Sequence, residues 1–121
     1  MTGEQLFQRA AALLGQELPD TAYLRTFALP CINQLLWDTL HCQQALERSR
    51  GAEATQSAPR LSQFEEEIPY EDGLVNTCLP YGLAALLVAD DDREEYNRFS
   101  AEFEQRLRRY CPCEFTALED F

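Results

Sequence analysis

Lysine is missing from this sequence: all ten basic residues are arginines, and they stand against 21 acidic residues. The formal net charge is therefore −11. A protein that binds duplex DNA needs basic side chains that displace counterions from the phosphates. The composition argues against sequence-specific nucleic-acid binding. It leaves three alternatives: a soluble acidic protein, a protein with a basic partner, and a surface along which DNA passes without sticking.

Long apolar runs are also missing. No run approaches the roughly 18 residues that cross a bilayer, and residues 1–15 lack the basic start and apolar block of a secretory signal. We therefore expect no membrane association and a chain that stays in the cytoplasm. With 121 residues, 45% of them apolar, the chain is long enough for one compact domain over residues 1–121.

Catalytic motifs are scarce. His41 is the single histidine, and on a helix its neighbour Cys42 points about 100° away, so the two cannot form a local nucleophile–base pair. There is no glycine-rich phosphate loop. No carboxylate pair stands in an apolar context that would shift its pKa. We therefore predict no enzymatic activity, no catalytic residue and no cofactor.

The five cysteines are an odd number, which argues against a disulfide framework. Cys31, Cys42 and Cys78 lie inside apolar helical patterns and are predicted to be small buried hydrophobes. Cys111 and Cys113 could offer two thiolates, but a zinc site needs four ligands. We interpret this pair as reduced thiols at the end of a helix and predict no metal site.

Apolar periodicity predicts helices over residues 2–16, 20–48, 72–88 and 92–110. In the second helix, Leu24, Phe27 and Ala28 belong to the apolar stripe. Pro30 lies within the second and should kink or split it, because proline removes a main-chain hydrogen bond. The expected fold class is mainly α, a four-to-five-helix bundle with a long loop.

The segments between and after these helices have a different composition. Residues 49–63 contain almost no large apolar side chains, which predicts a long flexible loop. Residues 64–70 favour an extended piece and leave room for a small β-hairpin. Residues 111–121 form a short tail.

The last two predicted helices differ in their apolar faces. Residues 72–88 are apolar almost all round, as in a central buried helix, and Pro80 and Gly82 predict a kink or a close helix–helix approach. The helix over residues 92–110 has one narrow apolar stripe that should face the core: Tyr96, Phe99, Phe103, Leu107 and Tyr110.

Three consecutive aspartates, Asp90, Asp91 and Asp92, stand where these two helices must meet. A calcium loop would need alternating ligands over about twelve residues and a glycine at the turn, which this segment lacks. An aspartate can instead cap the helix that follows by accepting hydrogen bonds from its free N–H groups. We predict a corner between two helices.

The order of these features resembles the small head–tail connector, or adaptor, proteins of tailed bacteriophages and prophages. The segment "EIPYEDGL" leads into "YGLAALL", the acidic corner and "EYNRFSAEFEQRLRR", so the resemblance covers roughly residues 64–110. The N-terminal half matches only in helix order. The prolines inside helices and the five cysteines depart from the family.

The resemblance implies a helical bundle with a small β-element that forms a ring under the portal of the capsid and extends the DNA channel. Its implied partners are further copies of itself, the portal and tail-completion proteins. Its implied location is the host cytoplasm during assembly and the virion neck afterwards. No catalysis is implied.

A ring requires two different complementary patches on each subunit. Trp37 lies off the apolar stripe of its helix, and arginines on the last helix could meet a neighbour's glutamates. The candidate interface residues are Trp37, Glu65, Glu66, Glu67, Arg106, Arg108 and Arg109. The alternative for the arginines is pairing within their own helix. The alternative functions are an acidic regulatory or inhibitor module that binds a basic protein, and a small enzyme.

Overall fold

The computed structural model describes residues 1–15 and 21–111 of the chain. Within these ranges it contains six helices: α1 (Gly3–Leu13), α2 (Ala22–Asp38), α3 (Leu40–Ser49), α4 (Asp72–Thr77), α5 (Leu79–Val88) and α6 (Arg93–Tyr110). The predicted mainly helical fold is confirmed.

The extended segment after the loop forms no hairpin within the described residues. Its strand-like pairing there is a single antiparallel bridge between Thr2 and Glu67. Gly3 N–H donates to the Glu66 carbonyl and Ile68 N–H donates to the Met1 carbonyl, at 3.1 and 2.9 Å. The segment thus pairs with the start of α1, a partner distant in sequence, and a hairpin is not the structure adopted.

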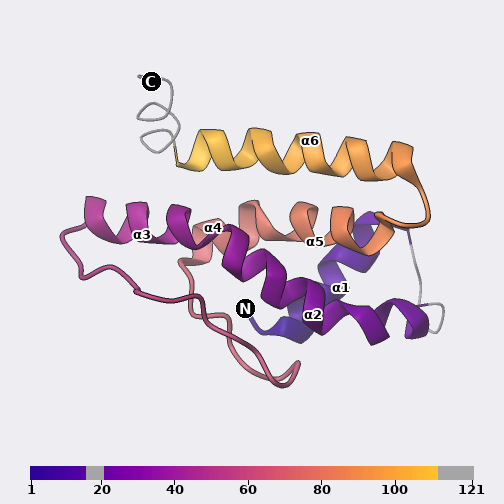
Figure 1. The fold of residues 1–121 in the computed structure, drawn as a ribbon, viewed down its shortest axis with the longest axis horizontal. Coiled ribbons are helices and arrows are strands. Elements are labelled where there is room, and N and C mark those ends of the chain that lie inside the picture. The colour runs from indigo at the N-terminus through magenta and orange to yellow at the C-terminus, as the bar shows by residue number, and fades with distance from the viewer. Residues whose placement is uncertain (16–20, 112–121) are drawn as a thin grey trace.

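Helix α5 lies at the centre of the bundle, as its composition predicts. Figure 1 shows α6 running antiparallel to α5 on one side, with α1 and α2 on the other. Large side chains of α5, including Leu79 and Leu83, are fully buried. On α6, Phe99 and Leu107 are buried, and Tyr96, Phe103 and Tyr110 pack against the core, which confirms the predicted stripe.

At Gly82, helix α5 lies close to both α2 and α6. A Cβ atom built there would lie 2.7 Å from Leu35 Cδ1 on α2 and 2.9 Å from Phe103 Cε1 on α6. Contacts below 3.0 Å are not found for real Cβ atoms. The close helix–helix approach predicted from this glycine is therefore present.

Pro80 and Pro30 have different effects from one another. Cys78 ends α4 and precedes α5, so Pro80 falls in the first turn of α5, where its missing N–H has no intrahelical partner to lose. Helix α2 instead continues through Pro30. The break predicted at Pro30 occurs at Thr39, whose buried hydroxyl and N–H both donate to the Leu35 carbonyl, at 2.8 and 3.0 Å. The hydroxyl thus adds a second hydrogen bond to the last helical one, and α2 ends here because the Thr39 backbone leaves helical geometry, with φ −104° and ψ 6°.

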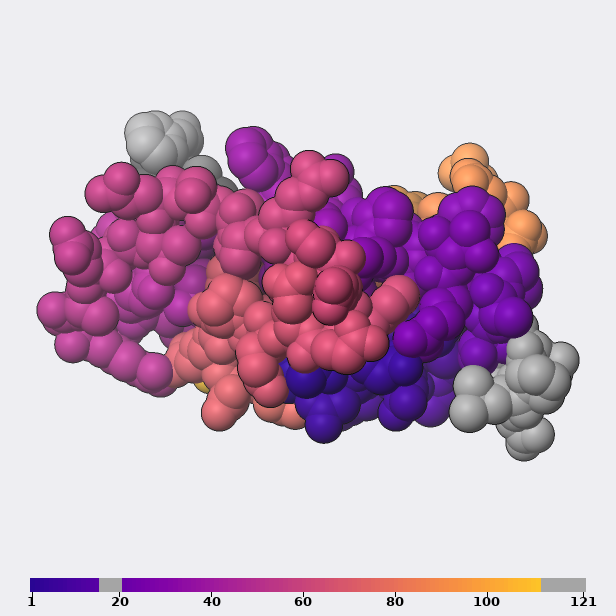
Figure 2. Space-filling model, turned by 90° about the horizontal axis from the view of Figure 1, so that it is seen from below, coloured from indigo at the N-terminus to yellow at the C-terminus, as the bar shows by residue number. Residues whose placement is uncertain are grey.

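The segment between α3 and α4 is non-helical, as predicted, and is tied to the bundle at several points. The Asn33 amide accepts from the Leu61 N–H and donates to its carbonyl, at 2.7 and 3.0 Å. The buried Tyr70 hydroxyl donates to the Leu36 carbonyl. Figure 2 shows this segment spread over one face of the molecule, beside the N-terminal residues.

Candidate interaction surfaces

Helix α2 carries every large hydrophobic side chain that is strongly exposed in the described ranges. Tyr23 is 53% exposed, Phe27 58% and Trp37 66%. The buried face of the helix is formed by Leu24, Ala28, Ile32, Leu35 and Leu36. Its opposite face thus leaves apolar area in contact with water, a property typical of interaction sites when the residues are grouped.

Trp37 belongs to the first of two such groups, which we call the Trp37 surface. It is formed by Trp37, Leu29, Pro30 and residues 58–62, which together line a hollow of about 650 Å³ between α2 and the long loop. Arg60, in this loop segment, is exposed. The hydrogen bonds between Asn33 and Leu61 hold the loop in place beside the helix.

Tyr23 and Phe27 belong to the second group, the Tyr23–Phe27 groove. Its walls come from α2, from the end of α5 and from the corner that follows, and it has a volume of about 400 Å³. The lining residues are Tyr23, Leu24, Phe27, Cys31, Leu86, Leu87, Asp90 and Asp91. Phe27 was predicted to lie on the apolar stripe of its helix, and its 58% exposure corrects that prediction.

The acidic rim of the groove is part of the predicted helix corner. The Asp92 side chain accepts from the Glu95 N–H at 3.1 Å and caps α6, so the predicted corner is confirmed. Asp90 and Asp91 are exposed. Burial, together with the charge of Asp90, raises the pKa of the Cys31 thiol in the groove. Among residues 1–15 and 21–111, no group of three His, Cys, Asp or Glu side chains is placed to hold a metal ion.

The predicted interface arginines on α6 are occupied within the chain. The Arg106 guanidinium lies 4.0 Å from the centroid of the Tyr81 ring, donates to the Tyr81 hydroxyl and forms an ion pair with Glu102 at 2.8 Å. Arg109 donates to Gln105, and Arg108 also has an interaction within the chain. These contacts favour the internal role that the sequence left open for the arginines.

Two of the three predicted interface glutamates form contacts within the chain. Glu66 accepts from the N–H groups of Ser62 and Gln63, at 2.9 Å each. Glu67 pairs with the terminal amine of Met1 at 3.0 Å. Glu65 is exposed and adds to the electrostatic field that raises the Arg25 pKa, after the larger effect of the hydrogen bond to Glu4.

Arg25 lies between the long loop and α1. Its guanidinium donates twice to Glu4, at 2.7 and 2.8 Å, and lies 4.2 Å from the centroid of the Phe64 ring and 5.5 Å from that of Phe7. A cation over an aromatic face is a favourable contact. This arrangement holds Phe64 against the bundle. Among the predicted interface residues, Trp37 is the one that leaves a large apolar side chain exposed to water.

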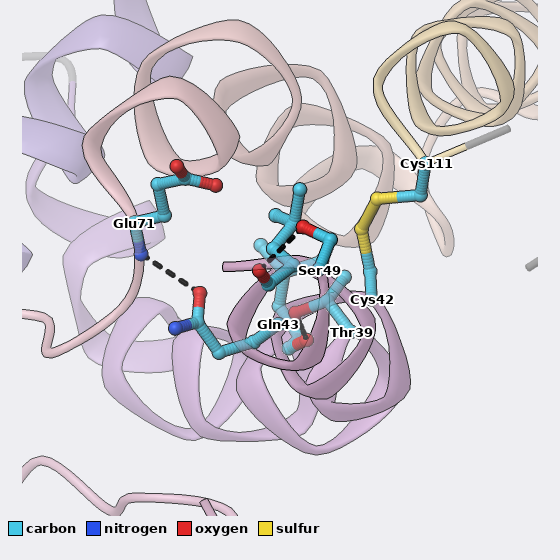
Figure 3. The surroundings of a disulfide bond; sticks show 8 residues. Thr39, Cys42, Gln43, Ser49, Glu71 and Cys111 are labelled. Atoms are coloured by element: carbon cyan, nitrogen blue, oxygen red, sulfur yellow. Dashed lines mark hydrogen bonds between the residues drawn. A yellow bond between two sulfur atoms is a disulfide. The ribbon is translucent and has the colours of Figure 1, made fainter. Parts of the chain in front are cut away.

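The cysteine prediction is wrong in two respects. Cys31 is only partly buried and lines the Tyr23–Phe27 groove. The second concerns Cys42 and Cys111. Cys42 and Cys111 form a disulfide bond between α3 and the end of α6, with Cα atoms 6.1 Å apart (Figure 3). Both residues are buried. Cys42 was predicted to be a small buried hydrophobe and Cys111 a reduced thiol at a helix end. Only the fold brings them together, from positions 69 residues apart. Cys113 lies outside the described residues.

Beside the disulfide, polar contacts join α3 to the start of α4. The Glu71 N–H donates to the buried Gln43 side chain at 2.8 Å, as Figure 3 shows, and the Glu71 carboxylate pairs with Arg50. Burial raises the pKa of the free Cys78 thiol to about 11, in agreement with its predicted role as a small buried hydrophobe. His41 is exposed and does not lie in the buried core.

Comparison with protein-family models, with curated proteins and with solved structures finds no match for this chain. A search of the described helices for a membrane-spanning segment finds none that is long and apolar enough.

Proposed function

We propose that this chain is a structural subunit that associates with copies of itself into a ring, as head–tail connectors of tailed phages do. The observation that carries the proposal is the pair of separate surfaces on α2: the Trp37 surface and the Tyr23–Phe27 groove. A ring built by rotation needs two different patches on each subunit, because its contacts are head-to-tail.

The charge of the chain supports the same proposal. A net charge of −11 without any lysine suits the wall of a channel through which DNA passes, since like charges do not bind. The further partners in this proposal are the portal and tail-completion proteins. The location is the host cytoplasm during assembly and then the virion neck. The role is structural and does not include catalysis.

The test is the oligomeric state as a function of concentration. Sedimentation velocity and native mass spectrometry of the purified chain, from low micromolar to several hundred micromolar, should reveal a closed oligomer with one defined subunit number. An electrophoretic mobility assay should find no sequence-specific binding to duplex DNA. A chain that remains monomeric over the whole range would contradict the proposal.

A second candidate function is an acidic regulatory or inhibitor module that binds a basic protein. It is favoured by the exposed Asp90 and Asp91 beside an apolar groove, because this combination suits a partner with basic and apolar side chains. This function predicts a monomer that forms a 1:1 complex with a basic protein and releases it at high salt. The sedimentation experiment therefore separates the two functions.

A further inference from the structure

The Tyr23–Phe27 groove combines an apolar floor with a negative rim. Leu24 and Leu87 line it and are buried, whereas Tyr23 and Phe27, which line it as well, are each more than half exposed. The opposite side is formed by the end of α5, where the helix dipole is negative. A ligand for this groove should therefore bring an apolar or aromatic group together with a hydrogen-bond donor or a cation.

The rim carboxylates have no cationic partner in the described part of the chain. Asp90 and Asp91 are exposed, and neither forms an ion pair within residues 1–15 and 21–111. Arg93 follows on the same corner and is likewise exposed without an ion pair there. The rim thus keeps an excess of negative charge that a second molecule can approach.

The Trp37 surface has the complementary properties. The Trp37 side chain is 66% exposed, and an indole carries a large apolar area and one N–H donor. Arg60 lines the same hollow, is exposed, and has no ion pair within the described ranges. One surface therefore offers an aromatic ring and a cation, and the other offers an apolar groove and two carboxylates.

The two surfaces of one chain cannot meet each other. Phe27 precedes Trp37 by ten residues on a continuous helix, which separates them by about 15 Å along the axis and by about 80° around it. A contact between the two surfaces must therefore join different copies of the chain. Such a contact is head-to-tail, and it closes into a ring or propagates as a filament.

We propose that Trp37 of one copy inserts into the Tyr23–Phe27 groove of the next copy, with Arg60 facing the carboxylates of Asp90 and Asp91. This inference rests on the proposed function, since it names the contact by which the copies associate. It replaces the arginine–glutamate contact that the sequence suggested, because Arg106 and Glu66 are bound within their own chain.

Two variants test the contact: Trp37→Ser removes the inserted side chain, and Phe27→Glu places a charge in the groove. Both positions are exposed, so the fold should survive, and far-UV circular dichroism checks that it does. Tryptophans that become buried at an interface are frequent hot spots of binding. Each variant alone should therefore associate with itself at least about 30-fold more weakly than the wild type does.

An equimolar mixture of the two variants is the decisive experiment. The Trp37→Ser chain keeps an intact groove, and the Phe27→Glu chain keeps an intact Trp37. The mixture should form a 1:1 heterodimer that cannot grow, visible by native mass spectrometry. Two monomers in the mixture, or full oligomers from either variant alone, would overturn the proposed contact.

The charges are tested in the same way. Arg60→Glu and Asp91→Arg should each weaken association, and the chain that carries both substitutions should recover part of it. Glu53→Arg is a matched control, because it changes an exposed charge of the chain without belonging to either surface. If the wild type forms oligomers and the variants at Trp37, Phe27, Arg60 and Asp91 form them equally well, the contact is refuted and the proposed function still stands. A monomeric wild type would refute both.

Discussion

The disulfide between Cys42 and Cys111 offers the most direct test of the tertiary structure. It joins positions 69 residues apart, so in the unfolded chain it closes a long loop. The loop-closure model assigns such a bond about 4 kcal/mol at 25 °C, and measured values for native disulfides fall roughly in the range 2–5 kcal/mol. Reduction leaves the burial of both side chains in place. We therefore expect it to lower the free energy of unfolding by about 2–4 kcal/mol.

The assay is guanidinium unfolding followed by circular dichroism, with and without a phosphine reductant. The variant Cys42→Ala is the control, because its stability should not respond to the reductant. Replacement of the free Cys78 by alanine should leave the response to reductant intact. On reduction, the rate of amide exchange should increase more in α3 than in the other helices, since α3 loses its covalent link to the end of α6. An oxidised wild type with the stability of the reduced one would refute the pairing.

Two further substitutions test the core. Gly82→Val should destabilise the fold by about 1–3 kcal/mol, because the added side chain would displace Leu35 and Phe103. The control is Ala101→Val on the exposed face of α6, which should cost only a few tenths of a kcal/mol in helix propensity. Equal losses of stability for the two variants in urea unfolding would contradict the close approach. Burial raises the pKa of the Tyr70 hydroxyl above its unfolded value of about 10, so the folded state holds this proton more tightly. The stability that this group contributes is fully present below about pH 10, and it decreases as the pH rises above the unfolded pKa of about 10. Tyr70→Phe should therefore weaken the loss of stability between about pH 9.5 and 11, and an unchanged pH profile would refute this assignment.

The sequence alone was enough to predict the helical class, the central position of α5 and the corner at Asp92. These features depend on local rules. An apolar repeat near 3.6 residues predicts which face of a helix is buried, and a capping side chain bonds an N–H group three residues away. Both helix caps follow this local rule. Thr2 and Gln5 form a capping box at the start of α1, and Asp92 caps α6 by accepting from the Glu95 N–H.

Features that join distant residues were decided by the tertiary structure. Periodicity assigned Phe27 to the core, but α2 has more apolar residues than its neighbours can cover, so packing determined which of them stays exposed. In the same way, α2 continues through Pro30 and ends at Thr39, a position that the sequence pattern did not single out. The partners of Cys42 and Arg106 lie 69 and 25 residues away from them, at Cys111 and Tyr81. No local pattern specifies such pairs, because they form only when the whole chain packs and its helices meet.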